Sequence, residues 1–122
     1  MESHKNLIVW QKSIDLVKLV YSTMHAFPHE ELFGLVSQIK RAVVSIPSNI
    51  AEGFGRGSKK ECKRFIHIAL GSAIELDTQI IISKELGFLG EEEYRIINSL
   101  LLEIKKMLKS LIRSLNTESL VN

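Results

Sequence analysis

The chain has 122 residues, of which 45% are apolar and 25% are charged, and its formal net charge is +2. This length and balance are typical of one globular domain with a substantial core, and they exclude an intrinsically disordered chain. A net charge of +2 is too small to identify a nucleic-acid-binding protein by itself, and the single cysteine, Cys62, excludes an intramolecular disulfide bond.

Apolar residues recur along the chain with spacings that alternate between three and four. They form four runs, from Trp10 to Met24, Leu32 to Ile50, Cys62 to Ile80 and Ile97 to Leu115. Such spacing keeps side chains on one face of a helix, and no segment shows sustained strand-like alternation. We therefore predict an all-α fold, a single domain over residues 1–122, with helices at about 7–26, 30–52, 58–86 and 91–115 and a frayed tail at 116–122.

The breaks between the runs agree with this division. Pro28 is expected to end the first helix, and Gly53 stands where a left-handed helix stop would place a glycine. Gly87 and Gly90 bracket the last connection, and the three glutamates that follow suit the positive end of a helix. Because short loops make sequential helices antiparallel neighbours, the sequence predicts an antiparallel up-down-up-down four-helix bundle.

A polar stripe runs along one face of the second predicted helix. Its members are Gln38, Arg41, Ser45, Asn49 and Glu52. These side chains suit specified hydrogen bonds better than a solvated face of Lys and Glu would, and Pro47 within the same helix predicts a kink or local unwinding. Two interpretations stay open, a recognition or assembly surface and a structural network inside the bundle.

The loop GFGRGSKK at 53–60 concentrates positive charge. From Gly53 to Arg64 five cations stand against Glu61, a local balance of +4, so the remainder of the chain carries −2. The glycines fit neither a P-loop nor a dinucleotide fingerprint, and the segment SKKE at 58–61 predicts a capping box. The loop is therefore either purely structural or an anion site at a helix N-terminus. The candidate nucleic-acid contacts are Arg56, Lys59, Lys60 and Lys63, with Arg41 and Asn49 as a second set.

The third and fourth predicted helices carry more small and apolar residues than one buried stripe needs. The small cluster Ala69, Gly71, Ser72 and Ala73 predicts either a close approach of a neighbouring helix or a contact with a ligand or second subunit. The additional apolar residues are Ile68, Leu70, Ile74, Ile81 and Ile82 in the third helix and Ile96, Leu100, Leu102, Met107 and Ile112 in the fourth. They favour either self-association or a larger core.

Catalytic and metal-binding patterns are not found. None of the four histidines follows a glutamate at the spacing of the di-metal bundle motif, and no H-E-x-x-H occurs. Cys62 lies on an apolar stripe, where it is expected to act as a small hydrophobe. We expect a non-enzyme without cofactor or metal. Since no signal peptide or run of about 18 apolar residues is recognised, we also expect a cytoplasmic protein without membrane contact.

The segments 7–17, 27–76 and 86–89 resemble a bacterial family of four-helix bundles, and QIKRAVVSIPSNIAEGFGRGS at 38–58 is the most specific part. The family is named after proteins encoded in intervening sequences of 23S rRNA genes and is also labelled S23-like ribosomal protein. The resemblance implies a cytoplasmic, left-handed antiparallel bundle whose relatives form toroidal homopentamers. A distant relative, the accessory protein of diversity-generating retroelements, is a basic pentamer that binds nucleic acid and a reverse transcriptase. The label does not make this chain a ribosome component, and its +2 charge is low for a nucleic-acid-binding ring.

The leading hypothesis is thus a homo-oligomer, pentameric by the resemblance, that binds RNA or DNA. The rival is a structural adaptor that docks a protein partner through the polar stripe of the second helix. A small-ligand or metal-binding bundle is the third alternative.

Overall fold

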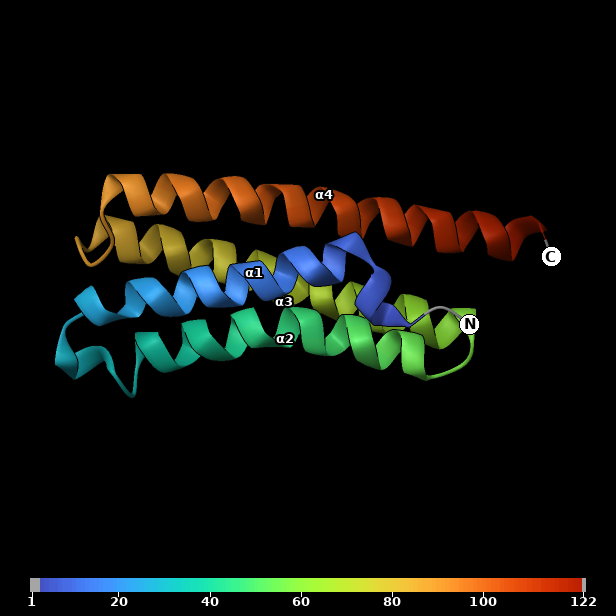
Figure 1. Ribbon diagram of the computed structural model, residues 1–122, viewed down its shortest axis with the longest axis horizontal. Helices are drawn as coiled ribbons and strands as arrows, with labels where there is room; N and C mark the ends of the chain where they lie inside the picture. The colour runs from blue at the N-terminus through green and yellow to red at the C-terminus, as the bar shows by residue number, and fades with distance from the viewer. Residues whose placement is uncertain (1–2, 122) are drawn as a thin grey trace.

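The computed structural model describes residues 3–121, with side chains from residue 3 to residue 116. Four long helices lie side by side in a bundle, and the described residues contain no strand (Figure 1). The helices are α1 (Ile8–Thr23), α2 (Leu35–Gly55), α3 (Lys59–Glu85) and α4 (Glu91–Val121), with short 3-10 helices η1 (His4–Asn6), η2 (Met24–Ala26) and η3 (His29–Glu31). The prediction of an all-α four-helix bundle is confirmed.

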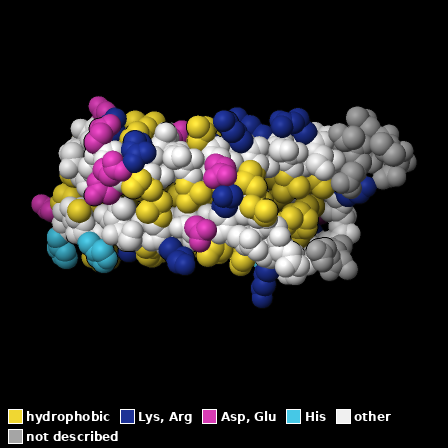
Figure 2. All heavy atoms as spheres, turned by 45° about the horizontal axis from the view of Figure 1, so that its top comes forward, with side chains coloured by type: hydrophobic (Ala, Val, Ile, Leu, Met, Phe, Trp, Pro, Cys, Tyr) yellow, Lys and Arg dark blue, Asp and Glu magenta, His cyan; other side chains and the backbone are white. Residues whose placement is uncertain are grey.

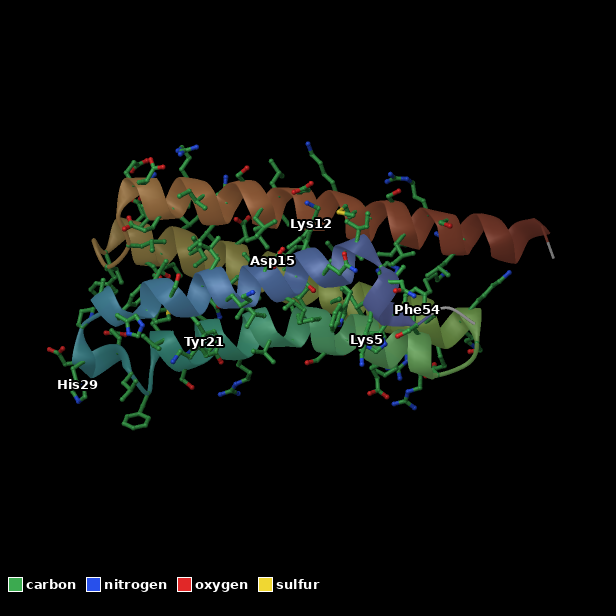
Figure 3. The ribbon with its side chains drawn as sticks, viewed as in Figure 1. Lys5, Lys12, Asp15, Tyr21, His29 and Phe54 are labelled. Carbon is green, nitrogen blue, oxygen red and sulfur yellow. The ribbon has the colours of Figure 1, made fainter. Side chains whose placement is uncertain are left out.

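Side-chain pairs fix the direction of α4 against α3. Lys63 bonds to Asn116, Asp77 pairs with Lys105, and Lys84 pairs with Glu91. Because the residue number rises along α3 as it falls along α4, the two helices are antiparallel. On the other side of α4, Lys12 Nζ of α1 lies 3.3 Å from Glu103 Oε2 (Figure 3).

The core follows the predicted stripes in α2, α3 and α4 but not in α1. In α1 the residues buried against the other helices are Val9, Ser13, Leu16 and Val20. Each lies one position before the predicted stripe, and Tyr21 of that stripe is 40% exposed. The apolar spacing did not reveal the buried stripe of α1, because the polar residue Ser13 interrupts it. Its hydroxyl donates to the carbonyl of Trp10 at 2.7 Å, so it is buried without losing a hydrogen bond.

The first half of the molecule also differs from the predicted boundaries. The second helix begins at Leu35 instead of residue 30, because η3 and Gly34, whose backbone is neither helical nor extended (φ −109°, ψ −107°), precede it. It continues through the buried Pro47, and no local unwinding occurs there. At the other end of the chain, α4 continues past the predicted helix end at Leu115 to Val121. Asn122 lies outside the described residues.

Gly53, and not Gly71, permits close packing between two helices. Gly53 does not stop α2, which ends at Gly55. A Cβ atom at Gly53 would lie 3.0 Å from Phe65 Cβ and 3.1 Å from the Cys62 carbonyl oxygen, so this glycine permits the close approach of α2 to α3. Gly71 is exposed and a Cβ there would meet nothing within 4 Å, so it is not the close-packing glycine.

The additional apolar residues of α3 and α4 divide between the core and the surface. Ile112 is buried, and Leu70, Leu100 and Met107 are half-buried and pack against the core. Exposed fractions of 40–51% are found for Ile68, Ile74, Ile81, Ile82, Ile96 and Leu102. The larger-core interpretation therefore accounts for only part of the surplus.

By length and composition alone, α3 is apolar enough to cross a membrane, which the sequence analysis did not expect. One of its faces lies in the core, and Asp77 in its second half is 3.1 Å from Lys105 of α4. A charged pair within a spanning helix is unfavourable. The apolar character of α3 is therefore that of a core helix with a second apolar face.

Candidate nucleic-acid interface

The loop between α2 and α3 turns at Gly57, whose φ of +85° lies in the left-handed region that glycine adopts without strain. Ser58 then caps α3, since its hydroxyl oxygen accepts a hydrogen bond from the Glu61 backbone N–H at 3.1 Å. This half of the predicted capping box is confirmed. Glu61 does not complete the box, because both of its carboxylate oxygens accept hydrogen bonds at 3.1 Å from Arg64.

The Glu61–Arg64 pair has a resolved electrostatic effect. The hydrogen bond from Arg64 is the main cause that lowers the pKa of the Glu61 carboxyl below its ordinary value of 4.5, with smaller contributions from the charges of Arg64, Arg56 and Lys60. The same hydrogen bond raises the pKa of Arg64. Glu61 thus neutralises Arg64.

Arg56 is anchored to the surface of the bundle. Its Nε lies 3.0 Å from Glu52 Oε2, and its guanidinium carbon lies 4.8 Å from the centroid of the Phe65 ring. The guanidinium carbon of Arg64 lies 4.5 Å from the same centroid. The nearly buried Phe65 therefore serves as a platform for two guanidinium groups, and it is not available for stacking on a nucleic-acid base.

The lysines of α3 occupy its first two turns. Lys59 and Lys60 are exposed, and the half-buried Lys63 donates a 2.7 Å hydrogen bond to Asn116 Oδ1 of α4. Among the described side chains, Lys60 has no carboxylate within ion-pair distance. The structure therefore brings Arg56, Lys59, Lys60 and Lys63 together at one end of the bundle.

The second half of α4 extends this group, which the sequence analysis missed. Lys106, Lys109 and Arg113 are exposed and share a helix face with Asn116, the partner of Lys63. Residues 104–116 contain no Asp or Glu, and this local run was the available signal. A single linear window of charge does not reveal it, because antiparallel α3 and α4 bring two distant windows side by side.

We call the combined group the basic surface. It consists of Arg56, Lys59, Lys60, Lys63, Lys106, Lys109 and Arg113. A cluster of three acidic residues lies at the opposite end, where Glu91, Glu92 and Glu93 open α4. Figure 2 shows on one face that Asp and Glu lie from the left end to the middle, whereas Lys and Arg occur at the left and also extend farther to the right.

Arg41 and Asn49 do not join the basic surface. Asn49 is half-buried, and its amide donates 2.8 Å hydrogen bonds to the carbonyl and the hydroxyl of Ser45. The Ser45 hydroxyl in turn lies 2.8 Å from that of Ser72 on α3, so this part of the polar stripe is a network inside the bundle. Arg41 is exposed, but it precedes Arg56 by about four turns, or roughly 22 Å of helix.

Arg41 instead lines a small polar depression of about 140 Å³ between α2 and α3, together with Gln38 and Glu75. Within the described residues, no group of three His, Cys, Asp or Glu side chains is arranged to hold a metal ion. Cys62 is buried in the core, as its position on an apolar stripe predicts.

Comparison with known proteins identifies relatives but no activity. A family model described as 23S rRNA-intervening sequence protein matches residues 5–110. A solved structure of a protein of unknown function from the S23 ribosomal protein family of Bacteroides thetaiotaomicron is similar, with 27% sequence identity and a TM-score of 0.80. That alignment covers 86% of this chain and 98% of the other. No curated protein matches significantly.

Proposed function

We propose that this chain, which belongs to the family of 23S rRNA-intervening sequence proteins, is a non-enzymatic binding module that holds the phosphate backbone of a nucleic acid on its basic surface. The observation that carries this proposal is a group of cations that begins at the end where α2 meets α3 and extends along α4 toward the middle of the bundle, in a chain whose net charge is only +2. Several dispersed cations suit a repeating phosphate better than one small anion, because each releases a condensed counterion on binding.

The geometry of the loop supports the same function. The first turn of α3 offers backbone N–H groups and the positive end of the helix dipole beside Lys59 and Lys60. The aromatic ring beside these cations, that of Phe65, is occupied by Arg56 and Arg64. We therefore expect contacts to phosphates with little preference for base sequence.

Self-association would strengthen such binding. The outer face of α3 exposes Ile68, Ile74 and Ile81 around Gly71, where an added Cβ atom would meet nothing of the described chain within 4 Å. We propose that this face packs against further copies of the chain, in a pentamer by the resemblance to the family. Several copies would present several basic surfaces, and avidity would raise a weak affinity.

Binding is tested by fluorescence polarisation with a labelled single-stranded RNA. About four phosphate contacts predict a roughly 50-fold loss of affinity between 50 and 200 mM salt. The double variant Lys59→Glu with Lys60→Glu should abolish binding. Its matched control, Lys18→Glu with Arg95→Glu, makes the same charge change away from the basic surface and should retain most of the affinity. Equal losses in the two variants, or no binding at low salt, would refute the proposal.

A second candidate is an adaptor that docks a protein partner through the polar face of α2. The exposed Arg41 favours it, since among the described side chains this arginine has no carboxylate partner although it shares a depression with Glu75. Arg41→Ala should then disrupt capture of a partner and leave RNA affinity unchanged. If Arg41→Ala instead lowers RNA affinity, Arg41 belongs to the nucleic-acid interface.

A further inference from the structure

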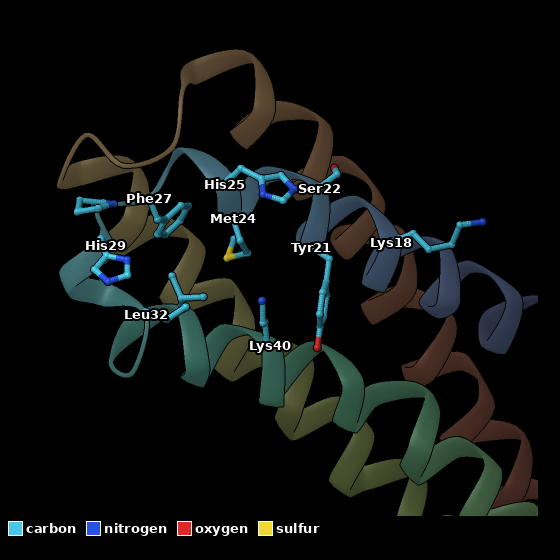
Figure 4. Close-up of a pocket in the computed structure, with 11 residues that line it drawn as sticks. Lys18, Tyr21, Ser22, Met24, His25, Phe27, His29, Leu32 and Lys40 are labelled. Atoms are coloured by element: carbon cyan, nitrogen blue, oxygen red, sulfur yellow. The ribbon is translucent and has the colours of Figure 1, made fainter.

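A hollow of about 660 Å³ opens between the end of α1 and the start of α2, at the opposite end of the bundle from the basic surface (Figure 4). The connection through η2, Pro28 and η3 carries the backbone around it. Its floor is apolar, because Met24, Phe27 and Val36 are buried members of the core that also line the hollow. Leu32, which is 42% exposed, forms one wall.

The ammonium group of Lys40 points into this space. Figure 4 shows Lys40 of α2 directed between Tyr21 of α1 and Leu32, and Lys40 Nζ lies 4.7 Å from the centroid of the Tyr21 ring. The Lys40 side chain is half-buried, so its charge is partly removed from water. A cation in that position over an aromatic face is attracted to the ring but keeps hydrogen-bond donors for another partner.

The remaining polar lining is also basic or neutral. His25 and His29 lie at the rim, and Lys18 and Ser22 complete the α1 side. Among the described residues no carboxylate lines the hollow, although Glu30 and Glu31 belong to the connection that surrounds it.

The cations that line the hollow differ in their pairing from those that join the helices of the bundle. Among residues 3–116 neither Lys40 nor Lys18 is within ion-pair distance of a carboxylate. By contrast, Lys12 pairs with Glu103, Lys84 with Glu91, and Lys105 with Asp77. The surroundings of Lys40 thus combine an apolar floor, an aromatic wall and a positive charge that no carboxylate of the described chain neutralises.

We infer that this hollow binds a small organic anion that carries one carboxylate and one apolar group. The carboxylate meets the Lys40 ammonium, and the apolar group lies against Tyr21, Met24 and Leu32. A volume of about 660 Å³ is within the range of pockets that hold small molecules, and a few placed polar groups above an apolar floor are their usual lining. This inference uses no residue of the basic surface and does not rest on the proposed function.

The test compares three probes by NMR titration of the full chain. The probes are 4-phenylbutanoate, its neutral analogue 4-phenylbutan-1-ol, and inorganic phosphate. We expect 4-phenylbutanoate to shift resonances of Tyr21, Met24 and Leu32 with a Kd on the order of 1 mM, which suits a ligand of this size. The alcohol should bind at least about fivefold more weakly for want of a charge-assisted hydrogen bond. Phosphate should leave these resonances unmoved.

Two variants test the role of the ammonium. Lys40→Met keeps the length and apolar stem of the side chain and should weaken 4-phenylbutanoate binding about tenfold, since a charge-assisted contact is lost. The matched control Lys106→Met removes an exposed charge at the other end and should leave binding unchanged. If Lys40→Met does not fold, Leu32→Glu at an exposed wall position should exclude the anion by repulsion.

Three results would overturn the inference. The first is equal affinity for 4-phenylbutan-1-ol and 4-phenylbutanoate. The second is unaltered 4-phenylbutanoate binding in Lys40→Met or, if that variant does not fold, in Leu32→Glu. The third is the absence of shifts around Tyr21 at 10 mM probe, roughly ten times the expected Kd.

Discussion

Both ends of the bundle carry basic side chains, but the two ends use them differently. Lys60 lies exposed at the end where α2 meets α3, Lys109 and Lys106 follow it along α4 toward the middle, and none has a carboxylate partner among the described side chains. At the opposite end, Lys84 and Arg95 are paired with the glutamates that begin α4, whereas Lys18 and Lys40 beside the hollow have no carboxylate partner among the described side chains. We therefore expect the pairing of charges, more than their total, to set which cations can bind an anion. A net charge of +2 conceals this because it averages over both ends.

The basic end depends on the close approach of α2 to α3, and Gly53→Ala should disturb it most. The new Cβ would lie 3.0 Å from Phe65 Cβ and 3.1 Å from the Cys62 carbonyl, which belongs to a helix that cannot easily move. Overpacking of this kind costs about 1–3 kcal/mol, more than the gain of roughly 1 kcal/mol in helix propensity. Urea denaturation should therefore show a lower free energy of unfolding.

Gly71→Ala is the matched control in the same bundle. Its Cβ would enter open space in α3, so only the propensity gain remains and stability should rise by about 0.5–1 kcal/mol. A stabilised Gly53→Ala variant would mean that the two helices separate at little cost.

The contribution of α4 to the basic surface is tested by Lys106→Glu with Lys109→Glu. Loss of two phosphate contacts and addition of repulsion should weaken RNA binding at least about tenfold, or roughly 1.4 kcal/mol. The double change Lys84→Glu with Arg95→Glu alters the total charge equally at the paired end and should have a much smaller effect. Equal effects would show that total charge governs binding and would remove the distinction between the two ends.

The ion pairs between α3 and α4 should differ in strength according to their exposure. The side chains of Asp77 and Lys105 are 28% and 18% exposed, whereas Glu91 of the Lys84–Glu91 pair is 79% exposed. Asp77→Asn should therefore lower the free energy of unfolding by about 1 kcal/mol, and Glu91→Gln by only about 0.3 kcal/mol. Thermal unfolding of both variants measures the difference, and a larger effect at Glu91 would contradict it.

The smallest expected effect is on the titration of Glu61 beside the basic surface. Because its pKa is lowered in the folded chain, its stabilising contribution is present above pH 4.5 and is lost as the pH falls through the folded value. Arg64→Gln removes the main cause, so the Glu61 pKa should rise toward its ordinary value. Carboxyl NMR titration measures this, and an unchanged pKa would assign the shift to another group.

The sequence predicts the bundle well because the spacing of apolar residues in α2, α3 and α4 is regular. It fails in α1, where Ser13 satisfies its hydroxyl within its own helix and so occupies a core position that apolar counting excludes. It also gives Gly53 the role of a helix stop and leaves the role of Gly71 open, since both are glycines in helical patterns and only the neighbouring helix distinguishes them.

The candidate site is predicted in part. The loop cations Arg56, Lys59, Lys60 and Lys63 can be found from the sequence because they are close together in the chain. The cations of α4 were missed because their proximity depends on the antiparallel pairing of helices, which a linear window cannot register. The sequence also does not predict that the Glu61 carboxylate bonds to Arg64 instead of to the backbone of the N-cap residue Ser58. Both Arg64 and Ser58 are three residues from Glu61.

The chain enters and leaves the bundle at the same end. In Figure 1 both termini lie on the side where α2 meets α3, and α4 projects past the start of α3 toward its last described residue. Any purification tag or fused domain is consequently tethered next to the lysines that are proposed to hold RNA, where a histidine-rich or acidic extension competes with or screens the ligand. The hollow beside Lys40 is at the far end, out of reach of a short extension. A tag would therefore alter RNA affinity at the basic surface but not anion affinity at the hollow, so the two affinities should be compared in tag-free protein.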